Sequence, residues 1–240
     1  MAKKKQIILP SIITEQSWFY KDNEELLKPY LGSPYISYSS VSSWEDYKDD
    51  FIKQKFMGLK LPSSIYGDFG TYTGAALEDG KFPEYNPHGF TGQENMNFDE
   101  LRPKNAEYEK MIVIPREDYI IIGFIDRYTE RTEDKIIKAH IRDQKTGGKG
   151  KENQYSDKKY TQVILYAHAI ENMGIEIEKT DVWFIRRTGS HLSPPLHISD
   201  EQFEIPLEYN EKRVKYALDK VDRVVNEISD LYQVYQKYFS

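Results

Sequence analysis

The amino-acid sequence predicts an α/β protein in which helices flank a mixed central sheet. Three observations lead to this fold class: a helical pattern near the start of the chain, three adjacent apolar segments in its centre, and a further helix followed by a further strand. This order is typical of a layered α/β structure and argues against a helical bundle or a β-sandwich. The 240 residues suffice for one sizeable domain with its own core.

The first helical pattern lies within residues 35–56. Serines at its start can cap a helix, and apolar side chains then recur at roughly helical spacing. A second, short helix is expected from about Thr71 to Leu77, ending before Asp79-Gly80. Residues 79–105 are rich in Gly, Pro and Asn and lack periodicity, which predicts a long loop or insertion. The helical pattern within residues 35–56 consists of Ser37, Ser39, Ser40, Val41, Trp44, Phe51, Ile52 and Phe56.

Three strands are expected in the centre of the chain. Met111–Ile114 is a short apolar run, Tyr119–Tyr128 reads as a buried strand, and Ile136–Asp143 reads as another. The polar segments 115–118 and 129–134 should form the turns between them. Because these connections are short, the strands should pair as an antiparallel meander.

A loop, a helix and a fourth strand should follow. Residues 146–156 are rich in glycine and lysine and should form the loop. Ser156-Asp157 can cap a helix that runs to about Asn172 and stops at Gly174. Asp181–Ile185 then reads as a strand.

The last expected element is a long C-terminal helix over about residues 210–238. Its apolar side chains form one stripe. We expect this stripe to pack within the domain; the alternative is that it pairs with a second copy of the chain and forms a homo-oligomer. The stripe consists of Val214, Leu218, Val221, Val225, Ile228, Leu231 and Tyr235.

The composition excludes several classes of protein. The 33 Lys+Arg and 39 Asp+Glu give a formal net charge of −6, which argues against attachment to nucleic acid through overall charge but allows a local basic groove. The absence of cysteine excludes disulfides, thiolate zinc sites and iron–sulfur clusters. No apolar run approaches the roughly 18 residues of a membrane span. The short apolar run after Met1 is too short for a signal peptide, so we expect a cytoplasmic protein.

Two aspartates and a lysine lie where adjacent strands end. Asp126 ends one apolar strand, while Asp143 and Lys145 lie at the end of the next. Residues two apart in a strand share a face, so Asp143 and Lys145 should point the same way, and a hairpin can bring Asp126 beside them. Two close carboxylates repel unless a cation lies between them, and their oxygens suit Mg²⁺ or Mn²⁺. The alternative is that both aspartates simply cap strand ends and Lys145 is solvated.

Two further pairs of residues, one on a helix and one on a strand, complete the pattern. Gln162 and Tyr166 are four residues apart on the expected helix and share one face, from which they can reach a phosphate or a base. His140 and Arg142 should face away from Asp143 because strand side chains alternate, so we interpret them as structural.

In this order the motifs resemble those of the RecB-like branch of the PD-(D/E)XK nuclease superfamily. Gly123-Phe-Ile-Asp126 resembles the family's G-x-x-D strand, Asp143-Gln-Lys145-Thr-Gly147 its D-x-K-T-G strand end, and Gln162-Val-Ile-Leu-Tyr166 its Q-x-x-x-Y helix. Upstream, the serine-rich segment from Tyr35 and the segment from Gly70 to Glu78 are similar to the family's opening helices.

The resemblance implies a fold and a set of metal ligands. The fold would be a restriction-endonuclease-like core, αβββαβ, over about residues 35–187 of a single domain that spans 1–240. Asp126 and Asp143 would bind metal, together with the backbone carbonyl of Gln144. Lys145 would position the attacking water.

It also implies contacts with DNA. Gln162 and Tyr166 would contact the strand near the cleaved phosphate. Lys149 and Lys151 belong to a basic stretch over 142–159, which would form a flexible flap near the DNA backbone; a solvated charged loop is the alternative.

The sequence departs from the family pattern on its second helix. Gly74 stands where many members have a metal-binding histidine. Glu78, one turn later, could supply a carboxylate ligand, or it could be a solvated residue at a helix end. The lack of cysteine also excludes the four-cysteine iron–sulfur clasp of some relatives.

The resemblance therefore implies a Mg²⁺- or Mn²⁺-dependent DNA nuclease. An exonuclease of recombination, repair or DNA end processing is the preferred form, and phage or mobile-element origin follows by analogy alone. The alternatives are a catalytically silent nuclease fold that binds DNA or protein, and a structure-specific endonuclease. A recombination or single-strand-binding protein is a further expected partner.

Overall fold

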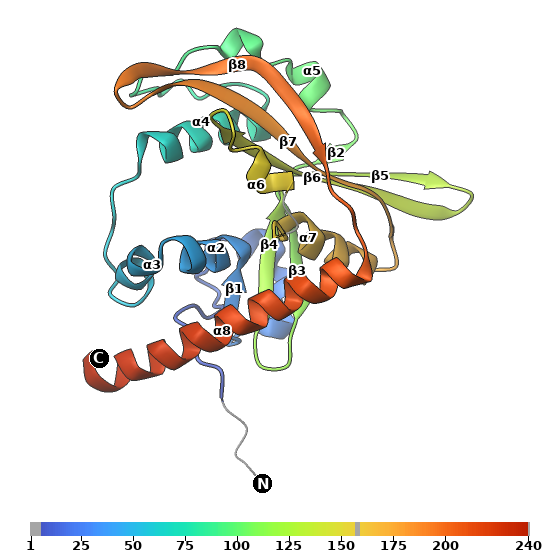
Figure 1. Ribbon diagram of the computed structural model, residues 1–240. Coiled ribbons are helices and arrows are strands. Elements are labelled where there is room, and N and C mark those ends of the chain that lie inside the picture. Colours follow the sequence, from blue (N-terminus) through green and yellow to red (C-terminus); the bar gives the residue numbers. More distant parts are fainter. Residues whose placement is uncertain (1–5, 157–158, 240) are drawn as a thin grey trace. The chain divides into compact units, whose positions relative to one another are not determined.

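A computed structural model describes residues 6–156 and 159–239. It confirms the α/β fold class: mixed sheets are flanked by helices, and a long helix ends the chain (Figure 1). Within the described part, the chain forms two compact units. The first unit comprises residues 6–62, 111–123 and 215–239, and the second unit comprises 63–110, 124–156 and 159–214. No helix of the described residues has the length and apolar character needed to cross a membrane.

The first unit holds a three-stranded sheet with the order β1-β4-β3, in which β1 runs parallel to β4. The expected opening helix is present as two helices, α2 and α3. The Ser37 side chain caps α2 by accepting the N–H of Ser40, as the serine pattern predicted. The elements in or mostly in this unit are η1 (Lys21–Asn23), α1 (Glu24–Leu27), η2 (Lys28–Tyr30), β1 (Tyr35–Ser37), α2 (Tyr38–Asp46), α3 (Lys48–Lys55), β3 (Lys110–Pro115), β4 (Ile120–Ile125) and α8 (Glu211–Phe239).

Polar contacts hold α8 within the first unit. Trp44 Nε1 donates to Glu227 Oε2 at 2.9 Å. Asp222 accepts hydrogen bonds from the Arg116 guanidinium and, at 2.5 Å, from the Tyr119 hydroxyl. The stripe predicted for this helix is buried at Val221, Val225 and Ile228, whereas Leu231 is exposed.

The second unit holds a five-stranded sheet with the order β2-β5-β6-β7-β8. Only the β6–β7 pair is parallel. Helix α7 packs against β6 and β7. Phe69 and Leu77 of α4 share an apolar core with Ile185 of β7 and Ile198 of β8. The elements are α4 (Ile65–Asp79), η3 (Gln93–Asn95), α5 (Phe98–Leu101), β2 (Ala106–Glu107), β5 (Arg127–Glu133), β6 (Ile136–Gly147), α6 (Asn153–Ser156), α7 (Gln162–Glu171), β7 (Glu176–Ser190) and β8 (Ser193–Pro206).

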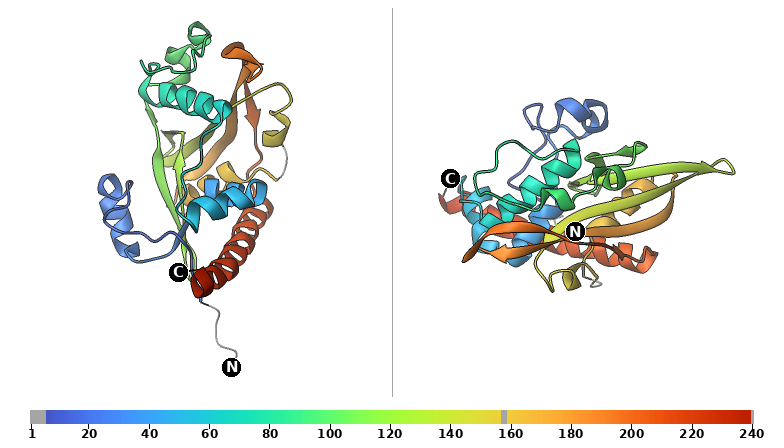
Figure 2. Two further views of the ribbon diagram at one scale, coloured as in Figure 1. Left: turned by 90° about the vertical axis from the view of Figure 1, so that its left-hand side faces the viewer. Right: turned by 90° about the horizontal axis from the view of Figure 1, so that it is seen from above.

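The prediction of one three-stranded meander is wrong, because β3 and β4 belong to the three-stranded sheet and β5 and β6 to the five-stranded sheet. The expected strand Tyr119–Tyr128 is divided at Asp126 into β4 and β5. The segment 129–134 was expected to be a turn, but most of it lies in β5, and the turn is the pair Asp134-Lys135, both with positive φ. Such φ values suit the two-residue hairpin turns that match strand twist. The result is a long β5–β6 hairpin whose tip extends away from the rest of the sheet (Figure 2).

Two helix boundaries also differ. Helix α4 begins earlier than expected, at Ile65, and ends at Asp79. Gly80, with a left-handed φ of 75°, forms its C-cap. Helix α7 begins at Gln162 and not at Ser156-Asp157, of which Asp157 lies outside the described residues. Thr161, the residue before α7, forms no side-chain cap, so a capping interaction does not mark the start of this helix.

The second half of the chain contains a strand that the sequence did not predict. Two adjacent prolines, Pro194-Pro195, are typical of a loop, but β8 pairs with β7 through this region and His197 lies opposite Thr188. Proline is tolerated there because β8 is an edge strand. The expected loop 79–105 includes η3 and α5 and buries apolar side chains, namely Phe90, Met96 and Leu101.

Candidate active site

The β5–β6 hairpin brings the two predicted aspartates together. Arg127 pairs with Arg142 in this hairpin, so Asp126, which directly precedes β5, lies beside Asp143. The backbone N–H of Gln144 donates to Asp126 Oδ2 at 2.6 Å. The juxtaposition expected from strand alternation is therefore present in the structure.

Asp143 is fully buried in β6, and its two carboxylate oxygens differ in their contacts. Oδ2 lies 2.7 Å from Lys145 Nζ and accepts a hydrogen bond from the Tyr160 hydroxyl at 2.5 Å. Oδ1 is buried and makes no hydrogen bond within the described residues. A buried charged oxygen without a partner is costly, so this atom indicates a place for a cation or a donor from outside the chain.

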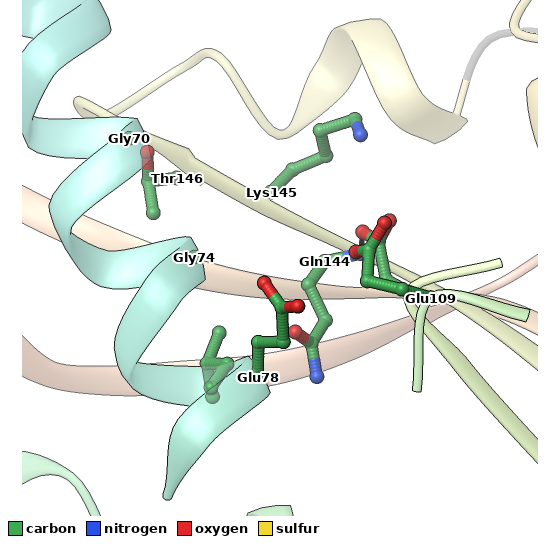
Figure 3. A pocket seen from close by; sticks show the side chains of 9 residues that line it. Gly70, Gly74, Glu78, Glu109, Gln144, Lys145 and Thr146 are labelled. Carbon is green, nitrogen blue, oxygen red and sulfur yellow. Dashed lines mark hydrogen bonds between the residues drawn. The ribbon is translucent and has the colours of Figure 1, made fainter. Parts of the chain in front are cut away.

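A pocket opens next to these residues between α4 and β6. Figure 3 shows Glu78, Gly74 and Gly70 along α4, opposite Gln144, Lys145 and Thr146 of β6. Glu109, from the turn before β3, projects toward the same space. The pocket is lined by Gly70, Gly74, Leu77, Glu78, Glu109, Asp126, Gln144, Lys145 and Thr146.

The charges around the pocket are not balanced. Burial and the neighbouring Asp143 carboxylate raise the pKa of Asp126 well above its usual range. Burial, followed by Glu78 and Asp143, raises the pKa of Glu109. Burial opposes the charge of Lys145, but the carboxylates of Asp143 and Asp126 outweigh it and keep the pKa of this ammonium high. The ammonium of Lys145 thus balances only part of the carboxylate charge around the pocket.

The donor set fits a hard divalent cation. Asp126, Asp143 and the glutamates of the pocket offer carboxylate oxygens, which Mg²⁺ and Mn²⁺ prefer. Asp143 Oδ1 is buried and has no hydrogen-bond partner in the part of the chain that the structure describes. Within residues 6–156 and 159–239, no three acidic or histidine side chains yet converge into a complete ligand set. Glu78 is exposed, so its side chain is free to move toward a cation.

The predicted pair on α7 is linked to the same carboxylate. Gln162 Nε2 donates to the Tyr166 hydroxyl at 3.0 Å, and the Tyr160 hydroxyl, which binds Asp143, lies 3.1 Å from Gln162 Oε1. Tyr166 is buried, and its burial raises the pKa of its hydroxyl. The pair thus shares one face, as expected, and its polar ends are directed toward Asp143.

The lysines of the predicted flap follow β6 and are exposed. Lys149 and Lys151 lie just beyond Gly147, where β6 ends. Lys151 Nζ lies 3.5 Å from Gln154 Oε1. Their contact with DNA stays a prediction.

Two residues of the site did not appear in the sequence interpretation. Glu109 adopts a left-handed φ of 52°, which disfavours most residues, so no local pattern marks it. Tyr160 was placed inside a helix because the start of α7 was expected too early. Since α7 begins at Gln162, Tyr160 lies in the preceding connection and reaches Asp143.

The opposite face of β6 carries a separate ionic cluster. Arg142 Nε and Nη2 lie 2.5 and 2.9 Å from the Asp181 carboxylate, and His140 Nε2 lies 2.6 Å from Asp181 Oδ2. Arg142 also pairs with Glu204 at 2.5 Å. His140 and Arg142 therefore face away from Asp143, as strand alternation predicted.

Comparisons with known proteins identify the family. The chain matches the model of the PD-(D/E)XK nuclease superfamily over residues 75–236. A crystal structure described as a "Putative exonuclease" from Eubacterium rectale is similar, with a TM-score of 0.49 and 13% sequence identity, over 91% of this chain and 88% of that one. The search of curated proteins finds no match. Because the superfamily match covers more than half of the chain, the protein belongs to the PD-(D/E)XK nuclease superfamily.

Proposed function

We propose that this nuclease hydrolyses phosphodiester bonds of DNA with the help of Mg²⁺ or Mn²⁺. The buried Asp143 carries the proposal. Its Oδ2 contacts the Lys145 ammonium and the Tyr160 hydroxyl, whereas its Oδ1 has no hydrogen-bond partner among the described residues. Family membership supports nucleic acid as the substrate class. An exonuclease of recombination, repair or end processing is the preferred form.

Asp126 and Asp143 would hold the cation, together with the backbone carbonyl of Gln144. Glu78 would complete the ligand set from α4. The bound ion would neutralise these carboxylates and stabilise negative charge on the phosphate. This role accounts for two carboxylates held close together in spite of their repulsion.

Lys145 has the reacting role among the chain's own groups. Its ammonium lies 2.7 Å from Asp143 Oδ2 and keeps its proton because the nearby carboxylates raise its pKa. It can therefore orient the attacking water and place positive charge beside a phosphate oxygen. Gln162, Tyr166, Lys149 and Lys151 are proposed to contact the DNA strand.

A catalytically silent nuclease fold is the second candidate, and Gly74 favours it. A Cβ atom at this position would meet nothing within 4 Å, so the pocket has room for a side chain that the sequence omits. Titration calorimetry with Mn²⁺ separates the candidates: a silent fold binds no divalent cation, whereas the nuclease does.

The main test compares linear and circular, single- and double-stranded DNA, with each linear form end-labelled. Wild type should degrade linear DNA with Mg²⁺ or Mn²⁺ and lose this activity with chelator. Lys145→Ala should be slower by about 100- to 1,000-fold, the range for loss of one preorganised group that stabilises developing charge. Lys138→Ala is the matched control, because Lys138 lies on the same strand and pairs with Glu133. Full activity in Lys145→Ala would refute the assigned mechanism.

A further inference from the structure

Two adjacent arginines of β7 have opposite surroundings. Arg186 pairs with Glu152 at 2.6 Å and also with Glu201. Arg187 forms no ion pair with any carboxylate of residues 6–156 and 159–239. Its guanidinium carbon instead lies 4.0 Å from the centre of the Tyr66 ring. In a chain with more acidic than basic residues, a cation left without a carboxylate is available to an anionic ligand.

Arg187 lies near the end of the strand that carries Asp143 and Lys145. Gly147 of β6 pairs with Arg186 of β7 in the sheet. A Cβ atom on Gly148 would lie 4.0 Å from Arg187 Nη2. The guanidinium therefore lies beside the loop that leaves β6, only a few residues after Lys145.

Tyr66 connects this arginine to the pocket through helix α4. Tyr66, Gly70, Gly74 and Glu78 are spaced four residues apart, so they follow one side of the helix over about 18 Å. The last three line the pocket (Figure 3). A Cβ atom on Gly74 would meet nothing within 4 Å. A Cβ atom on Gly70 would lie 3.6 Å from Thr146 Oγ1. On this side of the helix Gly70 and Gly74 therefore place no side chain between Tyr66 and Glu78, and the open space for a polynucleotide backbone lies at Gly74.

A histidine holds Tyr66 in place. The Tyr66 hydroxyl lies 3.1 Å from His191 Nδ1, and the two rings meet edge to face. A planar guanidinium stacked on a fixed aromatic ring loses little entropy when it binds a phosphate. The cluster of Arg187, Tyr66 and His191 is thus pre-organised for this contact.

We propose that Arg187 binds a backbone phosphate of the substrate strand, at the end of the pocket opposite Glu78, and that Tyr66 and His191 position its guanidinium. The proposal rests on the proposed nucleic-acid function. It adds a binding site outside the acidic pocket, and this site explains how a chain of net negative charge holds a polyanion.

The test measures binding of a fluorescent single-stranded oligonucleotide by anisotropy, with chelator present so that no cleavage occurs. Arg187→Ala should weaken binding about tenfold, as expected for one charge-assisted hydrogen-bonded contact. The slope of log K against log salt concentration should become shallower by about 0.7, which corresponds to one lost phosphate contact on a single strand. Arg131→Ala is the control, because Arg131 is an exposed arginine of the same unit that pairs with Glu178.

Two further variants separate charge from positioning. Arg187→Lys keeps the charge and should keep the wild-type salt slope while binding more weakly than wild type. Tyr66→Leu should weaken binding about threefold without changing the slope, because it removes only the stacking that orients the guanidinium. Thermal unfolding curves that match wild type show that each variant is folded.

The outcomes are distinct from those of the nuclease test. Binding by Arg187→Ala that equals wild type, or absence of any binding by wild type, would overturn the proposal. If wild type binds the oligonucleotide but does not cleave it with Mg²⁺ or Mn²⁺, the nuclease mechanism fails while the loss of affinity and slope in Arg187→Ala still supports the phosphate site.

Discussion

Asp143 and Asp181 are both fully buried, on neighbouring strands of one sheet, yet their surroundings are opposite. Asp181 is surrounded by donors from Arg142 and His140. Although burial alone would raise it, these hydrogen bonds hold the pKa of Asp181 well below its usual range. Among the described residues one oxygen of Asp143 has no hydrogen-bond partner, and burial together with the Asp143 charge raises the pKa of the adjacent Asp126.

The comparison distinguishes a structural carboxylate from a functional one. A buried charge with all its partners is part of the fold, whereas a buried charge that lacks partners is kept at a cost to stability and marks a site. Neither burial nor residue type separates the two aspartates. The number of hydrogen-bond donors around each carboxylate does.

Asp181→Asn should be strongly destabilising. Removing this carboxylate leaves Arg142 buried with only Glu204 as its ionic partner, so the free energy of unfolding should fall by about 3 kcal/mol. Urea denaturation measures the change. Asp134→Asn is the control, because Asp134 lies at the exposed hairpin tip with a φ of 50°, which asparagine tolerates. If both variants unfold alike, the Asp181 cluster is not structural.

Asp126→Asn should have the opposite effect on the metal-free protein. The substitution removes repulsion with Asp143, so the melting temperature should rise by about 2–4 °C, equivalent to about 1 kcal/mol. Stabilisation by added Mn²⁺ should be lost in the same variant, because a ligand is missing. Calorimetric scans with and without Mn²⁺ measure both changes; an unchanged response to Mn²⁺ would exclude Asp126 as a ligand.

The two aspartates should also give stability a different dependence on pH. Since the pKa of Asp126 is raised by folding, the metal-free protein gains stability from this group as pH falls from neutral through that raised pKa. Since the pKa of Asp181 is lowered, its contribution is complete above the unfolded value of about 3.9 and is lost as pH falls further. Melting temperatures of wild type, Asp126→Asn and Asp181→Asn, measured from about pH 2 to about pH 8, should separate the two contributions.

Tyr160→Phe should weaken cation binding while leaving the fold intact. The hydroxyl orients Asp143 through Oδ2, and loss of such an outer contact reduces metal affinity by about tenfold. Tyr155→Phe is the matched control, because Tyr155 contacts the Tyr160 ring edge to face. Calorimetric titration with Mn²⁺ gives both affinities, and equal values would show that Tyr160 only packs.

Strand alternation predicted which face of β6 carries Asp143 and which carries His140 and Arg142, because a side chain in a strand can point to only one of two faces. The pairing of β5 with β6 brings Asp126 beside Asp143, and the two-residue period places Arg142 and His140 on the other face. These relations depend on local periodicity, which the sequence displays directly.

The remaining parts depend on tertiary contacts. Tyr160 reaches Asp143 only because α7 starts at Gln162, and no capping residue marks that start. Glu109 enters the pocket through a backbone conformation that its residue type disfavours. The strand β8 begins next to two prolines and is stabilised by pairing with β7, so its own sequence reads as a loop.

Strand β6, which carries residues of both clusters, imposes a rule of parity on a change in its length. Arg142 and Asp143 are neighbours that serve opposite faces of one strand. Inserting a single residue between His140 and Arg142 would turn His140 toward the face of Asp143 and away from Asp181, because pairing with β7 fixes β6 from Arg142 onward. Inserting two residues would restore the face of His140. Natural variation in the length of β6 between these two residues is therefore expected to occur in even steps.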